Sequence, residues 1–411
     1  MNRLIMIWWL LLLSGNLWSR TIRAGKEQPI QTIQQALKIA VDGDTILVSA
    51  GHYHEGNLVI EKSVYFIGVN YPVLDGDHKY EVISVKADGV LVQGFKVINS
   101  GVSSMEDFAG IKIYNKREIR IEDNILENNF FGIYTQYGTR CIIRNNKLTA
   151  SAVEEQQSGN GIHCWKSDSM QVIANTINGH RDGIYFEFVT HSVIWRNISQ
   201  NNLRYGLHFM FSNNDAYYSN VFEGNGAGVA VMFSKEVTME NNYFEENWGD
   251  GSYGLLLKEI SNSFIVNNRF VKNTTGIFME GVSRVQLENN VFKNNGWAMK
   301  IQASCLEVNV YRNNFLSNSF DVGTNGSLVL NKFNNNYWDK YEGYDLNKDK
   351  LGDVPYRPVS MYAMIIEQNP PAMILFRSFM SSLLDKTEKI LPSLTPEDLK
   401  DDHPLMNSLP L

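Results

Sequence analysis

The sequence is short of cysteine, of clustered basic charge and of long apolar runs, and each shortage excludes a class of protein. Three cysteines in 411 residues are too few for a disulfide-stabilised scaffold. Lys and Arg number 37 against 44 acidic residues, a net charge of −7, and they form no run, which disfavours binding to nucleic acid. Hydrophobic residues make up 44% of the chain, so it holds enough apolar material for a real core.

The first residues have the pattern of a secretory signal. Asn2 and Arg3 are followed by an apolar run, 4–13, and then by polar residues. The run is about half of the roughly 20 residues that a membrane span needs. We therefore expect residues 1–24 to be a cleaved signal, cut after Ser19 or Ala24. No later stretch is long and apolar enough to span a membrane, so the mature protein is expected in a bacterial periplasm.

What the sequence has in excess is asparagine, and its spacing is periodic. Of 44 asparagines, 35 fall between Asn124 and Asn336. One column of asparagines recurs in steps of 22, 29, 22, 23, 22, 26 and 22 residues, and a column of glycines, each followed by an aliphatic residue, recurs in the same steps. The asparagine column is Asn124, Asn146, Asn175, Asn197, Asn220, Asn242, Asn268 and Asn290; the glycine column is Gly110, Gly132, Gly161, Gly183, Gly206, Gly228, Gly254 and Gly276. The two long steps place insertions near Ser151–Ser158 and Asn247–Tyr253.

This repeat predicts an all-β fold, a right-handed parallel β-helix with coils of about 22 residues. Short β-rich runs separated by Asn and Gly, without helical periodicity or a leucine pattern, favour this solenoid over a leucine-rich repeat. Coils stack about 4.8 Å apart, so equivalent positions form columns. Stacked asparagines then form a hydrogen-bonded ladder at a turn. The phenylalanines two residues later, 222, 244, 270 and 292, are expected to stack inside.

The two ends of the repeat are expected to differ from its middle. Residues 33–40 read as a short amphipathic helix that covers the first coil. The rhythm stops after Trp338, and 361–366 and 373–384 read as apolar helical patches split by Pro370-Pro371. We therefore expect a β-helix with its N-terminal cap over 25–338 and a loop with a helical docking tail over 339–411.

One outer face of the predicted solenoid carries soft metal ligands. The residues two and four positions after each repeat glycine are expected to point outward. This rule brings Met210 and Met232 one coil apart, places His208 on the same face as Met210, and puts His163 two coils away. Thioether and imidazole together suit Cu(I). We therefore consider His208, Met210, Met232 and His163 as candidate copper ligands. The alternatives are a protein-docking strip and a bulged strand that turns the methionines into the core.

Two further patterns are weaker signals of a functional site. Asp345, Asn347, Asp349 and Asp353 have the oxygen spacing of the start of a calcium loop, although Lys350 stands where an EF-hand has Gly; the alternative is a polar turn with solvated acids. Asp182, Glu187, Glu280 and Arg181 could supply acid–base chemistry on a sugar, but Glu280 lies four coils, about 19 Å, from Glu187.

Long strings of this sequence resemble the NosD family. The match covers almost the whole mature chain and is carried by residues 179–187 (GHRDGIYFE), 204–213 (RYGLHFMFSN), 226–232 (GAGVAVM), 253–258 (YGLLLK), 336–339 (NYWD) and 352–360 (GDVPYRPVS).

The resemblance implies a periplasmic, non-enzymatic accessory protein for the maturation of nitrous-oxide reductase. Members of the family act with an ABC permease and its ATPase and with a copper-carrying lipoprotein chaperone, which implies transient copper binding and membrane association through the permease. The apolar C-terminal helices would then dock on the permease or on lipid. The alternative function is that of a carbohydrate-active β-helix protein, an epimerase or lyase or a glycan-binding module.

Overall fold

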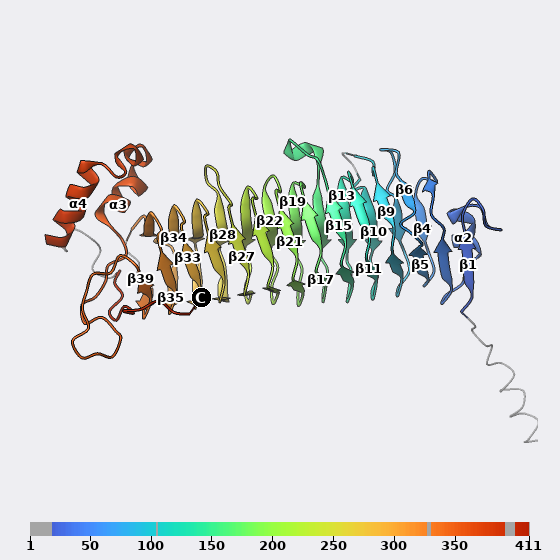
Figure 1. The fold of residues 1–411 in the computed structure, drawn as a ribbon. Coiled ribbons are helices and arrows are strands. Elements are labelled where there is room, and N and C mark those ends of the chain that lie inside the picture. Colours follow the sequence, from blue (N-terminus) through green and yellow to red (C-terminus); the bar gives the residue numbers. More distant parts are fainter. Residues whose placement is uncertain (1–18, 104–105, 327–329, 391–398, 411) are drawn as a thin grey trace, which may run out of the picture.

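Each coil of the chain contributes one strand to each of three parallel sheets, which together form a long rod (Figure 1). The structure is a computed structural model that describes residues 19–103, 106–326, 330–390 and 399–410. The expected signal segment lies mostly outside the described residues. The sheets contain 14, 13 and 12 strands and are called sheets 1, 2 and 3 below.

The strands are short, and their order along each sheet follows the order of the coils. Sheet 1 consists of β1 (Thr21–Ala24), β2 (Thr45–Val48), β5 (Tyr65–Gly68), β8 (Leu91–Gln93), β11 (Arg120–Glu122), β14 (Ile142–Arg144), β17 (Gln171–Ile173), β20 (Val193–Trp195), β23 (Ala216–Tyr218), β26 (Thr238–Glu240), β29 (Ser261–Val266), β32 (Ser283–Glu288), β35 (Leu306–Tyr311) and β38 (Lys332–Asn334). Sheet 2 consists of β3 (His52–Tyr53), β6 (Val73–Asp75), β9 (Lys96–Ile98), β12 (Ile125–Glu127), β15 (Lys147–Thr149), β18 (Thr176–Asn178), β21 (Ile198–Gln200), β24 (Val221–Glu223), β27 (Tyr243–Glu245), β30 (Arg269–Val271), β33 (Val291–Lys293), β36 (Asn314–Leu316) and β39 (Tyr337–Trp338). Sheet 3 consists of β4 (Leu58–Ile60), β7 (Ile83–Val85), β10 (Ala109–Tyr114), β13 (Phe131–Gln136), β16 (Asn160–Trp165), β19 (Asp182–Glu187), β22 (Tyr205–Met210), β25 (Ala227–Met232), β28 (Tyr253–Lys258), β31 (Thr275–Glu280), β34 (Trp297–Ile301) and β37 (Phe320–Gly323).

The predicted fold is confirmed. The chain forms a right-handed parallel solenoid of about 14 turns, with coils of about 23 residues. Both insertions lie in the turn between sheets 2 and 3, where Figure 1 shows them projecting from the rod. The first contains the 3-10 helix η1 (Glu155–Gln157). Since the insertions leave the strand pairs on either side of them in register, the coils continue past them unchanged.

The asparagine column forms the expected ladder inside the turns. The Nδ2 group of Asn220 donates to Oδ1 of Asn242 and to the carbonyl of Ile194, both at 3.0 Å. Its Oδ1 accepts from the backbone N–H of Asn197 at 2.9 Å and from Nδ2 of Asn197 at 3.0 Å. A second ladder runs through Asn202, Asn225, Asn247, Asn273, Asn295 and Asn318. Each buried amide therefore satisfies backbone groups that the turn would leave without partners.

Aromatic rings stack along the interior as predicted. The Phe222, Phe244, Phe270 and Phe292 rings are fully buried, and successive centroids lie 5.5, 4.6 and 4.9 Å apart. The column continues through Phe315 to Trp338, with spacings of 4.9 and 3.9 Å. The three cysteines, Cys141, Cys164 and Cys305, are buried and free, so they lie in the core and not on the outer face.

A short helix covers the first coil, as expected. Helix α2 (Ile33–Ile39) begins after Thr32, whose hydroxyl accepts from the N–H of Gln35, and Glu55 accepts the N–H groups of Ile33 and Gln34. Strand β1 precedes it and pairs with β2. Cleavage after Ser19 retains β1 and cleavage after Ala24 removes it, so we propose the earlier site.

The C-terminal residues contain a helix where 361–366 predicted one, but the patch expected over 373–384 is divided between a 3-10 helix that begins at Pro370 and a separate α-helix, after which the chain returns to the last coil. The helices are α3 (Met361–Gln368), the 3-10 helix η2 (Pro370–Leu375) and α4 (Phe379–Ile390). Tyr362 and Ile366 of α3 pack with Trp297 and Phe320 of sheet 3. Farther along, Asp401 forms bridges to Phe333 and Tyr356. The C-terminal residues thus cover the end of the rod opposite α2 (Figure 1).

Candidate metal-binding face

On the outer face of sheet 3, the two methionines considered as copper ligands lie side by side. Strands β22 and β25 pair in parallel with Met210 opposite Met232 and His208 opposite Ala230. The residues between them in sequence, Phe209 and Val231, are fully buried in the core, so Met210 and Met232 lie on the outside. Both methionine residues are partly exposed, and adjacent strands of a sheet lie about 4.8 Å apart. The alternative in which a bulge turns these methionines into the core is therefore wrong.

His208 and His163 belong to one stack of rings on this face. The rings of Tyr134, His163, Tyr185 and His208 follow one another with centroid distances of 4.5, 4.8 and 4.7 Å. The Tyr185 ring therefore separates the two imidazoles. His208 lies in the same strand as Met210, whereas His163 lies two coils away, as its position in the repeat predicts.

Both imidazoles are buried and have nitrogen atoms without hydrogen bonds. His208 is 6% exposed, and within the described residues neither Nδ1 nor Nε2 has a hydrogen-bond partner. His163 is 8% exposed and its Nε2 also lacks a partner, while Nδ1 lies 3.4 Å from Nδ2 of Asn160. Burial lowers the pKa of His163 to about 3, aided by the charge of Arg181. A neutral imidazole with a free lone pair is the form that binds a metal ion.

Beside His208, Arg204 and Asp182 form an ion pair in which both carboxylate oxygens are hydrogen-bonded. Arg204 donates to both carboxylate oxygens of Asp182, at 2.9 and 2.7 Å, and Asp182 is completely buried. Burial acts to raise the pKa of Asp182, but the neighbouring His208 and Arg204 outweigh it and hold that pKa below its usual range. The Oδ2 atom lies 3.9 Å from Nδ1 of His208. Asp182 is thus the counter-charge of Arg204 and is poorly placed to act as an acid on a sugar.

The remaining carboxylates considered for sugar chemistry do not meet. Glu187 lies in β19 and Glu280 in β31, and four strand pairings separate them along sheet 3. At about 4.8 Å for each step, this separation is about 19 Å, beyond the range for two carboxyl groups acting on one glycosidic bond. The Nζ atom of Lys258 lies 3.5 Å from Glu280.

A column of exposed aromatic rings borders the methionines, and the sequence analysis missed it. Phe188, Phe211 and Phe233 each follow the outward residue at the end of a strand, and their rings stack at 5.1 Å in both steps. They are 44%, 39% and 41% exposed. Each has a positive φ, near 52°, which turns its side chain away from the core. The signal was present in the sequence, because these residues stand five positions after the repeat glycines.

The predicted calcium loop is held together by its own backbone. Asp345 accepts the N–H groups of Lys348 and Lys350, and Asp349 accepts that of Leu351. Asn347 and Asp353 likewise accept backbone N–H groups, from Asp349 and Leu346. These bonds are those of a polar turn. Calcium binding at Asp345, Asn347, Asp349 and Asp353 stays a prediction.

The C-terminal helices leave a number of apolar side chains exposed. Ile374 of η2 is 88% exposed and Phe379 of α4 is 83% exposed, and Met380 and Leu383 are also exposed. Among the described residues, no helix has both the length and the apolar character required to cross a membrane.

The sequence is similar to a known protein family and to two named bacterial proteins. The family described as "Periplasmic copper-binding protein (NosD)" matches residues 149–347, which include sheet 3 around the methionine pair. A relative from Pseudomonas aeruginosa, named a probable ABC transporter binding protein NosD, is 26% identical over 389 residues, 90% of each chain. A protein of the same name from Stutzerimonas stutzeri is 26% identical over 378 residues, 87% of this chain and 85% of that one.

Solved structures share the fold. The A-module of the Azotobacter vinelandii mannuronan C-5 epimerase AlgE4 has a TM-score of 0.50 at 16% identity, covering 74% of this chain and 88% of the module. The α-1,3-glucanase of Streptomyces thermodiastaticus has a TM-score of 0.57 at 12% identity, covering 75% and 62%. PfbA, a surface adhesin of Streptococcus pneumoniae, has a TM-score of 0.56 at 11% identity, covering 71% and 89%. At these identities the likeness concerns the fold alone.

Proposed function

We propose that this chain, which the NosD family model matches over residues 149–347, is a periplasmic, non-enzymatic subunit of an ABC-transporter complex that assists copper delivery to nitrous-oxide reductase. Its task is to hold the permease, a copper-carrying lipoprotein chaperone and the reductase together. The observation that carries the proposal is the pairing of Met210 with Met232 on the face that also holds His208.

The chemistry of this face suits transient binding of Cu(I). Two thioethers and one imidazole match a soft monovalent ion, and no carboxylate belongs to the set. Met210 and Met232 are partly exposed, so a partner's ligands can reach the ion and replace them one at a time. His208 has no hydrogen bond to break before it binds. We propose that His163, beyond Tyr185, is a further station for the ion.

Two apolar surfaces support the docking part of the proposal. The Phe188, Phe211 and Phe233 column lies next to the methionines, where a copper carrier would have to approach. Exposed apolar side chains of η2 and α4 lie at the C-terminal end of the rod, and we propose that they contact the permease. Contiguous exposed apolar surface of this kind is typical of protein interfaces.

The metal proposal is tested by anaerobic Cu(I) titration against a competing chelator. Met210→Leu and Met232→Leu each remove one thioether and keep the volume of the side chain, so each should weaken Cu(I) binding by about tenfold or more. Met380→Leu, an exposed methionine on α4, is the matched control and should bind as the unmodified protein does. Unchanged affinity in both face variants would show that copper does not bind here.

The same purified proteins can distinguish copper binding from the alternative, carbohydrate-active function. A polysaccharide panel tested against the unmodified protein should give neither binding nor turnover. Binding of a glycan that is lost in Phe211→Ala would favour the carbohydrate-active alternative and make the aromatic column a sugar platform.

A further inference from the structure

A second group of metal-ligating side chains lies near the N-terminal end of the rod, on sheet 2. His52 and His54 are two residues apart, and Asp75 and Asp77 occupy the next coil. Strand β3 pairs with β6 so that Tyr53 is opposite Leu74, and both of these are buried. The residues that flank them therefore share the outer face, and the two sequence pairs form a compact array.

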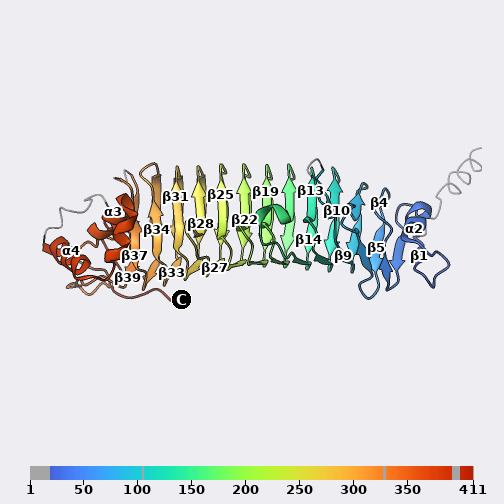
Figure 2. The same ribbon diagram turned by 90° about the horizontal axis from the view of Figure 1, so that it is seen from above.

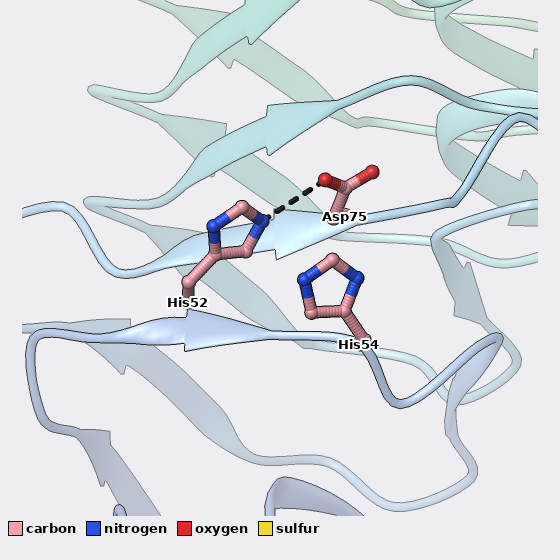
Figure 3. A group of neighbouring side chains, drawn as sticks. All are labelled: His52, His54 and Asp75. Atoms are coloured by element: carbon pink, nitrogen blue, oxygen red, sulfur yellow. Dashed lines mark hydrogen bonds and ion pairs between the residues drawn. The ribbon is translucent and has the colours of Figure 1, made fainter.

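The side chains of His52, His54 and Asp75 converge (Figure 3). Nε2 of His52 lies 2.9 Å from Oδ2 of Asp75, and Nδ1 of His54 lies 2.6 Å from Oδ1 of Asp77. The two imidazole rings stack with their centroids 4.4 Å apart. His52, His54 and Asp75 each offer one ligand atom, and these three atoms lie within 4.8 Å of one another. Ligands of a tetrahedral ion lie about 3.4 Å apart, so small rotations of exposed side chains would close the set.

Hydrogen bonds already orient the ligands as supporting residues do in metal sites. Oδ1 of Asp75 accepts from the N–H of Asp77 and from Nδ2 of Asn99, which leaves Oδ2 turned toward His52. Asp77 holds Nδ1 of His54, so Nε2 of that ring remains for a metal. A carboxylate on the second nitrogen of a ligating imidazole fixes the ring and raises its basicity.

The surroundings leave room for an ion and for its exchange. A surface cavity of about 320 Å³ borders His52 and His54. The side chains of His52 and His54 are about half exposed, whereas that of Asp75 is 9% exposed. Glu55, which also lines this cavity, accepts the N–H groups of Ile33 and Gln34 at the start of helix α2. A buried anion with two accessible imidazoles leaves a fourth position open.

We propose that His52, His54 and Asp75 bind a borderline divalent transition-metal ion of the Zn²⁺ or Cu²⁺ class, with Asp77 orienting His54. Imidazole and carboxylate ligands suit such ions, whereas Cu(I) prefers the thioethers on sheet 3. Asp75 lies five coils, about 24 Å, from the coil that carries Met210, and the two histidines lie six coils, about 29 Å, from it. The site is therefore separate in position and in chemistry from the proposed copper face.

The test is a titration of the full chain, purified without a polyhistidine tag, with Zn²⁺ followed by calorimetry and with Co²⁺ followed by visible absorption. One equivalent should bind, and His52→Gln and His54→Gln should each weaken binding by about tenfold or more. The matched control is His191→Gln, because His191 pairs with Asp168 at 2.9 Å without a second imidazole. It should leave the affinity unchanged, as should Met210→Leu.

Two results would overturn the proposal: no Zn²⁺ binding by the unmodified protein, or unchanged binding in both histidine variants. Protection of His52 and His54 from diethylpyrocarbonate by Zn²⁺, mapped by mass spectrometry, gives the same answer without any substitution. Loss of Zn²⁺ binding with Cu(I) binding intact, or the reverse, shows which of the two metal sites has failed.

Discussion

A single buried amide such as that of Asn220 connects three coils, because it donates to the coil after it and accepts from the coil before it. Asn220→Ala removes four hydrogen bonds and leaves buried backbone and amide groups unpaired. We expect a loss of about 3 kcal/mol or more in the free energy of unfolding. Urea unfolding followed by circular dichroism measures it.

The control for this substitution is Asn241→Gly. Asn241 precedes the next ladder residue, Asn242, and has a positive φ, 56°; its side chain is exposed, and glycine accepts that backbone conformation. It should change stability by only a few tenths of a kcal/mol. Equal losses in both variants would mean that the buried ladder amide contributes no more to stability than an exposed asparagine of the same turn.

The buried carboxyl of Asp215 should make the stability of the fold depend on pH. Burial raises the pKa of this carboxyl to about 8, and the charge of Asp168 adds to the effect, against one hydrogen bond from the N–H of Ser192. The folded state therefore holds a proton that the unfolded chain releases near pH 3.8. The contribution of Asp215 is complete below that pH and is lost as the pH rises toward 8.

Asp215→Asn removes this titration and keeps an acceptor for Ser192. The free energy of unfolding of the variant, relative to the unmodified protein, should rise by up to about 1.4 kcal/mol for each pH unit between pH 5 and 8. Asp250→Asn, in an exposed loop, should run parallel to the unmodified protein. A flat difference for Asp215→Asn would mean that its carboxyl is ionised in the folded state.

At the scale of elements, the last rung of the asparagine ladder needs an acceptor, and the C-terminal segment supplies it. Asp401 accepts from the N–H groups of Asn335 and Asn336, from Nδ2 of Asn336 and from Nε1 of Trp338. A carboxylate suits the end of the ladder because it accepts without requiring a further partner.

Asp401→Ala should therefore loosen the end of the rod and leave its middle intact. Hydrogen exchange should speed up by about tenfold or more in β36 and β39, since several buried donors lose their acceptor together. The pairing of β22 with β25 serves as the internal control and should keep its protection. Uniform loss of protection along the rod would show that the solenoid opens as one cooperative unit.

The elements that the sequence predicted are those that repeat. Asn220 and Phe244 belong to columns whose spacing alone fixes their neighbours, so the ladder, the ring stack and the pairing of Met210 with Met232 could be read in advance. Asp401 could not, because it lies 65 residues beyond Asn336 in a segment without period. His52 and Asp75 were missed because the first coils lack the Gly and Asn markers that set the register.

At the scale of the whole molecule, the proposed sites lie at different positions along the axis of the rod. Sheet 1 contains 14 strands, so 13 steps of about 4.8 Å place the two ends about 60 Å apart. Figure 2 shows α3 and α4 at one end and α2 at the other. The outer face of sheet 3 with Met210 and Met232, the methionine face, lies between the two ends. The array of His52, His54 and Asp75 lies near the α2 end. If the C-terminal end docks on a permease as proposed, the rod extends away from the membrane and presents both proposed metal sites to periplasmic partners.

The proposed orientation predicts which substitutions would detach the protein from the proposed permease. Phe379→Ser with Leu383→Ser removes two exposed apolar side chains of α4, so thermal stability should not change, while co-purification with the permease should fall by about tenfold or more. Leu306→Ser, at an equally exposed leucine on β35, is the matched control and should co-purify normally. Cu(I) binding should survive in every variant, because the methionine face is untouched. Normal co-purification of the α4 variant, with loss of it in Phe211→Ala, would instead place the permease against the side of the rod.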